Sequence, residues 1–85
     1  MKSFTTPDFW QGYAQLTPEM KEQAQKAYQL WQENPRHPSL HFKKVGKNLW
    51  SVRVSIGYRA LALKKGDYYY WFWIGVHDQY ESLLN

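Results

Sequence analysis

Hydrophobic residues recur at two different spacings along this 85-residue chain. In the first part they recur every three or four residues, as on one face of an α-helix: Phe9, Tyr13 and Leu16, and then Met20, Ala24, Ala27 and Trp31. Thr6-Pro7 and Thr17-Pro18 each place an N-cap residue before a proline at the first helical position. The pattern predicts a first helix of two to three turns from Pro7 and a second from Pro18 to Glu33, where Asn34-Pro35 ends it.

Residues 40–76 instead form three runs of strand-forming residues. The runs cover residues 40–45, 49–63 and 68–76, and the breaks at 46–48 and 65–67 contain Gly, Asn and Asp, which favour turns. Short glycine-containing connections between such runs are typical of an antiparallel meander. Gly57 inside the middle run predicts a bulge or bend. The last run is apolar on both sides up to Gly75, which is expected to end a central strand.

These patterns predict one α+β domain over residues 1–85, with an N-terminal helical hairpin packed on a small antiparallel meander sheet. Residues 1–5 are compatible with a short extra strand, and the tail after Gly75 with about one helical turn. In the middle run, Trp50, Val52, Val54 and Ile56 alternate with polar positions, so Arg53 is expected on the opposite face.

The positive charge of the chain is concentrated in the predicted sheet. The net charge is +4 and the pI about 9.4, and residues 43–65 hold seven of the eleven Lys and Arg residues and no acidic one. A sheet with cations on its strand positions is expected to hold an anionic partner. The chain has no cysteine, no apolar run near the roughly 18 residues that span a bilayer, and no signal-peptide pattern at its start. A cytoplasmic protein without membrane contact is therefore expected.

Four segments carry a resemblance to a known family. They are His37-Pro38-Ser39-Leu40, Trp50-Ser51-Val52-Arg53-Val54, Gly57-Tyr58-Arg59-Ala60-Leu61, and Ile74-Gly75-Val76-His77-Asp78 with Tyr80. With the two helices before them, these segments resemble the RelE/ParE superfamily, the toxins of bacterial type II toxin–antitoxin systems. The resemblance implies a small α+β fold in which a short first strand joins the meander sheet and the helix pair packs on one face.

The resemblance also implies a function, a partner and no cofactor. Many family members cut messenger RNA at the ribosome without a metal, whereas ParE-type members poison DNA gyrase and lack the catalytic set. The expected partners are a cognate antitoxin, mRNA and the ribosome. A gyrase poison, or a degenerate member that acts only through its antitoxin complex, is the alternative. A general RNA-binding module is a third, weaker interpretation.

Metal-free RNA cleavage needs a base, an acid and cations that stabilise the charge growing on the phosphorane. Arg53 and Arg59 suit the cation role, since a guanidinium fork matches phosphate oxygens. The resemblance adds Lys43 and Lys44 as phosphate-binding residues. For proton transfer the tail offers an imidazole, a carboxylate and a phenol, at His77, Asp78 and Tyr80.

Each of these residues also has a purely structural interpretation. The arginines are also compatible with ordinary surface positions on strands, and the remaining lysines with edge residues that block strand pairing. His77 is compatible with a hydrogen bond inside the tail and Asp78 with an N-cap. The aromatic run 68–73 is more typical of sheet packing than of base stacking. His37 and His41 have a metal-like spacing, but no third ligand is near and no metal is predicted.

Overall fold

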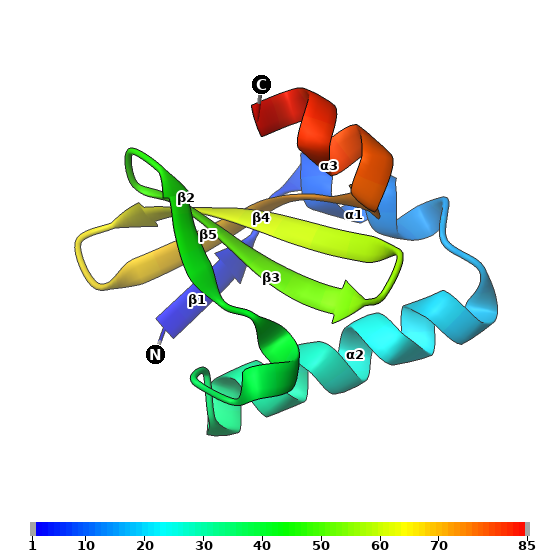
Figure 1. The fold of residues 1–85 in the computed structure, drawn as a ribbon, viewed down its shortest axis with the longest axis horizontal. Helices are drawn as coiled ribbons and strands as arrows, with labels where there is room; N and C mark the ends of the chain where they lie inside the picture. The colour runs from blue at the N-terminus through cyan, green and yellow to red at the C-terminus, as the bar shows by residue number, and fades with distance from the viewer. Residues whose placement is uncertain (1, 85) are drawn as a thin grey trace.

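Residues 2–84 are described by a computed structural model. In chain order the elements are β1 (Lys2–Thr5), α1 (Pro7–Ala14), α2 (Pro18–Glu33), the short 3-10 helix η1 (Pro38–Leu40), β2 (Lys43–Gly46), β3 (Leu49–Ser55), β4 (Tyr58–Lys65), β5 (Tyr68–Val76) and α3 (His77–Leu84). The five strands form one sheet in the order β1-β5-β4-β3-β2. β1 pairs parallel to β5, and the other pairs are antiparallel. The predicted α+β class is confirmed (Figure 1).

Both long helices begin where the Thr-Pro pairs predict. The Thr6 hydroxyl accepts a hydrogen bond from the Phe9 amide at 3.3 Å, and the Thr17 hydroxyl accepts one from the Met20 amide at 3.2 Å. Each bond satisfies one of the amides that an α-helix leaves without a partner in its first turn. The second helix ends at Glu33, as the following Asn-Pro pair predicts.

The strand bounds correct the sequence interpretation at four places. The middle run is two strands, because the chain reverses at Ile56-Gly57 and pairs β3 with β4. Ile56 is therefore 81% exposed at a turn and does not share the buried face. Leu40 lies in η1, so the first run becomes a strand only at Lys43. β5 continues through Gly75 to Val76, because that position still pairs with β4, and the tail forms α3, longer than the single turn expected.

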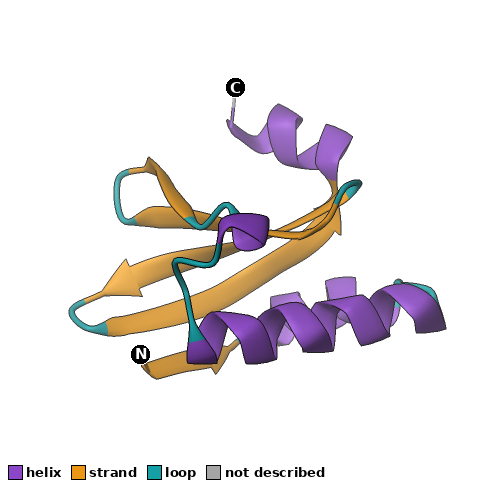
Figure 2. Ribbon diagram, turned by 60° about the horizontal axis from the view of Figure 1, so that its bottom comes forward, coloured by secondary structure: helices purple, strands orange, loops and turns teal. Residues whose placement is uncertain are grey.

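The sheet carries helices on both of its faces. α1 and α2 lie on one side, where they contact β5 and β3, and α3 lies over the other side against β4 and β5 (Figures 1 and 2). α3 follows β5 without a loop, and the His77 amide donates to the Gly57 carbonyl oxygen at 2.8 Å. The start of the C-terminal helix is thus tied to the β3–β4 turn.

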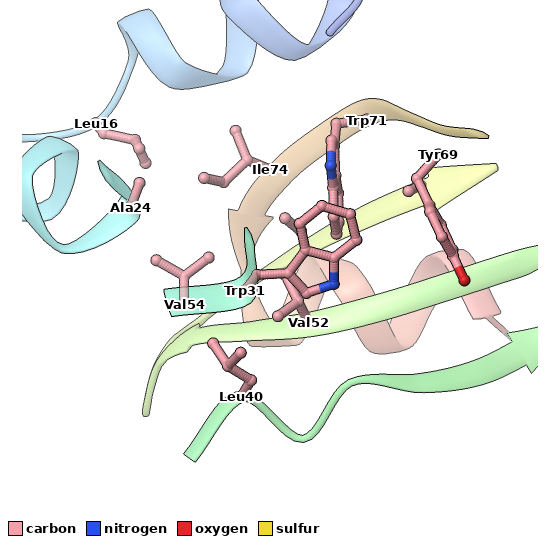
Figure 3. Close-up of a cluster of buried hydrophobic side chains, with 11 residues drawn as sticks. Leu16, Ala24, Trp31, Leu40, Val52, Val54, Tyr69, Trp71 and Ile74 are labelled. Carbon is pink, nitrogen blue, oxygen red and sulfur yellow. The ribbon is translucent and has the colours of Figure 1, made fainter. Parts of the chain in front are cut away.

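The core lies between α2 and the sheet and is centred on Trp31, which is 1% exposed (Figure 3). The rings of Phe42, Tyr69 and Trp71 stand nearly perpendicular to its indole, with centroids 5.6, 5.4 and 5.3 Å away. Burying an aromatic side chain removes about 150–250 Å² from water, or about 4–6 kcal/mol at 25 cal/mol per Å². Aromatic packing of this kind offsets the small size of the chain.

α1 is held close to β5. The backbone amide and the hydroxyl of Thr6 both donate to the Trp71 carbonyl oxygen at 3.1 Å. Further along the same helix, a Cβ added at Gly12 would lie 2.8 Å from the Ile74 carbonyl oxygen. Only glycine allows the helix to approach β5 this closely.

Candidate functional site

Arg53 and Arg59 stand directly opposite each other on β3 and β4. Their chain neighbours Val52, Val54 and Ala60 are buried in the core under the helices, so the arginines lie on the other face. Burial lowers the pKa of the Arg59 guanidinium, and the positive charge of Arg53 lowers it further. Like charges in register destabilise a sheet. The fold therefore keeps two positive charges opposite each other, although this arrangement is electrostatically unfavourable.

One nitrogen of Arg59 also closes the β3–β4 turn. Its Nη1 donates to the carbonyl oxygens of Ser55, Ile56 and Tyr58, at 2.8, 3.2 and 2.9 Å. Within residues 2–84, Nε and Nη2 of Arg59 have no hydrogen-bond partner. The turn thus fixes the position of the guanidinium while leaving part of its donor set available.

Arg53 is held more loosely. Within residues 2–84 its side chain forms one hydrogen-bond contact, with His41, whose Nε2 lies 3.4 Å from Nη1, at the long limit of a hydrogen bond. His41 has a left-handed backbone with φ 44° at the end of η1, which turns the chain into β2. A hollow of about 440 Å³ opens beside Arg53, between α2, η1 and the end of β3.

α3 brings a histidine, a carboxylate and a phenol next to the arginine pair. The His77 Nε2 lies 3.4 Å from an oxygen of Glu81, one helical turn later. The rings of His77 and Tyr80 have centroids 5.7 Å apart. Tyr80 and Glu81 both favour the charged form of Arg59 and so act against the lowering of its pKa. Tyr80 and Glu81 of α3 therefore lie within electrostatic reach of Arg59.

Tyr80 is buried, with 7% of its surface exposed. Its hydroxyl donates to the Ser51 hydroxyl of β3 at 3.2 Å, and Ser51 is itself only 2% exposed. This bond joins α3 to the third strand across the sheet face. The hydrogen bond from Tyr80 explains why a polar residue, Ser51, can occupy a buried position on β3.

The structure brings together most of the side chains that the sequence singled out. Arg59, His77 and Tyr80 lie on the face away from α1 and α2. Arg53 stands opposite Arg59 on that face and also borders the hollow beside α2. Lys43 pairs with Ser51 and so belongs to that face, whereas Lys44 pairs with Trp50, which packs toward the core. Both lysines are exposed.

Asp78 does not join this cluster. It follows His77 on α3 and is exposed, and within residues 2–84 its carboxylate forms no hydrogen bond or ion pair. Asp78 lies in the first turn of the helix proper, which begins at His77, so the N-cap interpretation is wrong.

The site residues were also compared with the 440 Å³ hollow beside α2 and with the side chains that could bind a metal ion. Arg53 alone of the site residues lines the 440 Å³ hollow, and residues 2–84 hold no cluster of three potential metal ligands.

Sequence reasoning missed Glu81, Ser51 and His41. Glu81 is four residues after His77, a spacing that becomes informative only if the tail forms a helix longer than one turn. Ser51 carries a weaker signal, a small polar residue between apolar ones. His41 comes beside Arg53 only through the tertiary fold.

Fold and site together define a small α+β protein with a basic sheet face that is covered by a C-terminal helix. A family model described as the ParE-like toxin domain matches residues 18–82. The chain therefore belongs to the ParE-like toxin domain family, within the RelE/ParE superfamily, as the sequence resemblance predicted. Compared with curated protein sequences, the chain has no match.

Solved structures share the fold at low sequence identity. The RelB–RelE antitoxin–toxin complex from Methanococcus jannaschii matches with a TM-score of 0.75 and 12% identity, over 96% of this chain and 99% of that one. A YoeB/ParE toxin from Agrobacterium tumefaciens gives 0.68 and 16%, over 91% and 99%. A copper-bound mutant toxin from Helicobacter pylori gives 0.61 and 14%, over 93% and 97%. None of the helices described here is long and apolar enough to cross a bilayer.

Proposed function

We propose that this chain is the toxin of a type II toxin–antitoxin pair and that it cuts mRNA at the ribosome without a metal. The observation that carries the proposal is the in-register pair Arg53 and Arg59 beside a His77–Glu81 contact. Two cations directly opposite each other on neighbouring strands lower the stability of the sheet, so selection for stability alone would not favour them. A phosphate group bound between them removes the repulsion, and its charge is spread over oxygens that guanidinium groups bind well.

The chemistry requires one phosphoryl transfer inside the RNA strand. The 2′-hydroxyl loses its proton to a base and bonds to phosphorus, while the bond from phosphorus to the 5′-oxygen breaks and that oxygen is protonated. The products are a 2′,3′-cyclic phosphate and a free 5′-hydroxyl. Arg53 and the free nitrogens of Arg59 would neutralise the phosphorane, a role that typically contributes about 10²–10³-fold to the rate.

His77 would move the protons. Glu81 lies 3.4 Å from its Nε2 and would orient the imidazole, as a carboxylate does for a catalytic histidine. Glu81 would thus be the carboxylate partner of His77 in place of Asp78, the carboxylate that the sequence singled out. Tyr80, buried and bonded to Ser51, would position α3 over the arginines instead of donating a proton. Lys43, exposed on the same face, would contact a neighbouring phosphate.

The partner would be an antitoxin encoded beside this chain and acting in the same cytoplasm. The RelE fold from Methanococcus jannaschii, which this chain shares, occurs in a complex with RelB. A partner segment rich in acidic and apolar residues suits both the basic sheet and the helix pair, and it would fold as it binds. A basic chain with a net charge of +4 also favours fast association with an acidic partner.

The nuclease proposal is tested with two substitutions that remove chemistry without touching the core. Arg53→Gln and His77→Gln are expected to relieve growth arrest on induced expression. With purified ribosomes and mRNA they should lower the cleavage rate by about 10²–10³-fold. Arg36→Gln is the matched control, since Arg36 is exposed and outside the cluster. Circular dichroism checks that each variant is folded. If Arg53→Gln and His77→Gln both arrest growth as strongly as the parent chain, the assignment is wrong.

A gyrase poison is the second candidate, because the matching family model is ParE-like. The same purified protein decides between the two. Cuts in ribosome-bound mRNA support the nuclease, and gyrase-dependent breaks in plasmid DNA without mRNA cuts support the poison. In the second case the arginine pair would contact gyrase or its DNA, and His77→Gln would leave toxicity unchanged.

A further inference from the structure

His41 stands at one end of the row of side chains that contains the arginine pair. In the antiparallel ladder of β2 and β3, Lys43 pairs with Ser51. Two residues before Lys43, His41 therefore comes level with Arg53. The 3.4 Å contact between the His41 Nε2 and the Arg53 Nη1 agrees with this register. From Arg53 the row continues across the sheet to Arg59, so His41, which is exposed, is its outer member.

His77 stands at the other end of this row. Arg59 pairs with Gly75 of β5, and His77 follows Gly75 by two residues, at the start of α3. Strands lie about 4.8 Å apart, so the backbone at His41 and the backbone at Gly75 are separated by about 14 Å. The two arginines occupy the middle of that span. One histidine therefore stands on each side of the place proposed for the phosphate.

The two imidazoles contact groups of opposite kinds. A guanidinium group only donates hydrogen bonds, so the His41 Nε2 beside Arg53 is an acceptor and carries no proton. An ionised carboxylate only accepts them, so the His77 Nε2 beside Glu81 carries a proton. The contact of His41 is long and weak. A phosphate that binds Arg53 would release the His41 nitrogen with its lone pair free.

We propose that His41 is the general base of the cleavage reaction and His77 its general acid, an inference that rests on the proposed nuclease function. In-line attack places the 2′-oxygen and the departing 5′-oxygen on opposite sides of phosphorus, so two separate groups serve them. The His41 Nε2 takes the proton of the 2′-hydroxyl as the new bond to phosphorus forms. His77 gives a proton to the 5′-oxygen as its bond to phosphorus breaks. One proton thus moves from His77 to His41 in effect, and exchange with water restores both.

A pH profile can report on these roles because only a histidine normally changes charge between about pH 5 and 8. The chain has three histidines. The third, His37, is bonded through its Nδ1 to the Ser39 hydroxyl at 2.8 Å, inside the η1 segment. The charged and titratable groups near the other two within residues 2–84 are Arg53 and Lys43 around His41, and Asp78, Tyr80, Glu81 and Arg59 around His77.

The test measures single-turnover cleavage of ribosome-bound mRNA by His41→Asn. Asparagine tolerates the left-handed backbone at this position, with φ 44°, and its side-chain oxygen can accept from Arg53, but it takes up no proton. The rate is expected to fall about 10²–10³-fold, and the increase in rate from low to neutral pH should disappear. His37→Asn is the matched control, because asparagine is a favoured N-cap and His37 caps η1. Its rate and pH profile should match those of the parent chain.

A second substrate separates the two roles. It is the same mRNA with sulfur in place of the departing 5′-oxygen, and a thiol is acidic enough for the sulfur to leave without a proton. On this substrate His77→Gln should cut within about threefold of the parent rate, because the acid is no longer needed. His41→Asn should stay about 10²-fold or more below the parent, because the 2′-hydroxyl still needs its base.

Each contrary result has a distinct meaning. A His41→Asn chain that cuts like the parent would remove His41 from the reaction and leave the nuclease proposal standing. A lower rate with an unchanged pH profile would make His41 a positioning residue for Arg53, and rescue of His41→Asn by the sulfur substrate would make it the acid. A parent rate that does not rise and fall with pH would contradict the assignment even if His41→Asn does not fold. No cleavage by the parent on either substrate would overturn the nuclease proposal and this inference together.

Discussion

The hydrogen bond between Tyr80 and Ser51 allows a quantitative test of how α3 is attached to the sheet. Tyr80→Phe removes the donor and leaves the Ser51 hydroxyl buried without its partner, and Ser51→Ala does the reverse. Each single substitution is expected to destabilise the fold by about 1–2 kcal/mol, because an unpaired buried polar group costs more than its net hydrogen bond contributes. The double variant should also cost about 1–2 kcal/mol, since both polar groups are then absent.

Urea unfolding of the four proteins gives the coupling free energy directly. The two single costs together come to about 2–4 kcal/mol and the double variant costs about 1–2 kcal/mol, so we expect a coupling of about 1–2 kcal/mol across this 3.2 Å bond. Each single variant should lower the midpoint of thermal unfolding by roughly 4–16 °C in a chain of this size. A coupling near zero, with additive single effects, would refute the reasoning and show that α3 is held by packing alone.

The same variants separate the two roles open to Tyr80. If Tyr80 only positions α3, Ser51→Ala should reduce cleavage of ribosome-bound mRNA about as much as Tyr80→Phe. If Tyr80 also donates a proton to the substrate, Tyr80→Phe should lower the rate about 10²-fold or more below Ser51→Ala. Equal rates in all four proteins would show that neither Tyr80 nor its hydrogen bond to Ser51 contributes to the reaction.

The remaining predictions concern the sheet and the core. Gly12→Ala should lower the free energy of unfolding by about 1–3 kcal/mol, because the new methyl group would lie 2.8 Å from a backbone carbonyl oxygen. Gly57→Ala is the control: its methyl group would meet nothing within 4 Å, so the free energy of unfolding should change by no more than about 0.5 kcal/mol in the same urea titration. Arg53→Gln should raise the unfolding free energy by about 0.2–1 kcal/mol by removing the repulsion from Arg59, and a loss of stability would contradict the repulsion. Trp31→Ala should cost about 3–5 kcal/mol and leave the chain largely unfolded at 37 °C, which circular dichroism would report.

Much of the architecture follows from local signals in the chain. The Thr-Pro pairs mark both helix starts because an N-cap hydroxyl and a proline act within one turn. Gly66, with φ 59°, forms the β4–β5 turn at the position that its sequence context predicts. The sequence around Ile56-Gly57 predicts only a bulge or bend where the chain in fact reverses, since a two-residue turn and a bulge have similar compositions.

The sequence by itself determined the α+β class, the helical hairpin, the basic sheet and the family likeness, because periodicity, caps and charge placement are local properties. Only the tertiary structure decided which cations meet and which carboxylate stands beside the histidine. Strand register put Arg53 opposite Arg59, and the second turn of α3 put Glu81 beside His77 in place of Asp78. Register and helix length depend on contacts between distant segments, such as Tyr80 with Ser51, and those contacts exist only once the chain has folded.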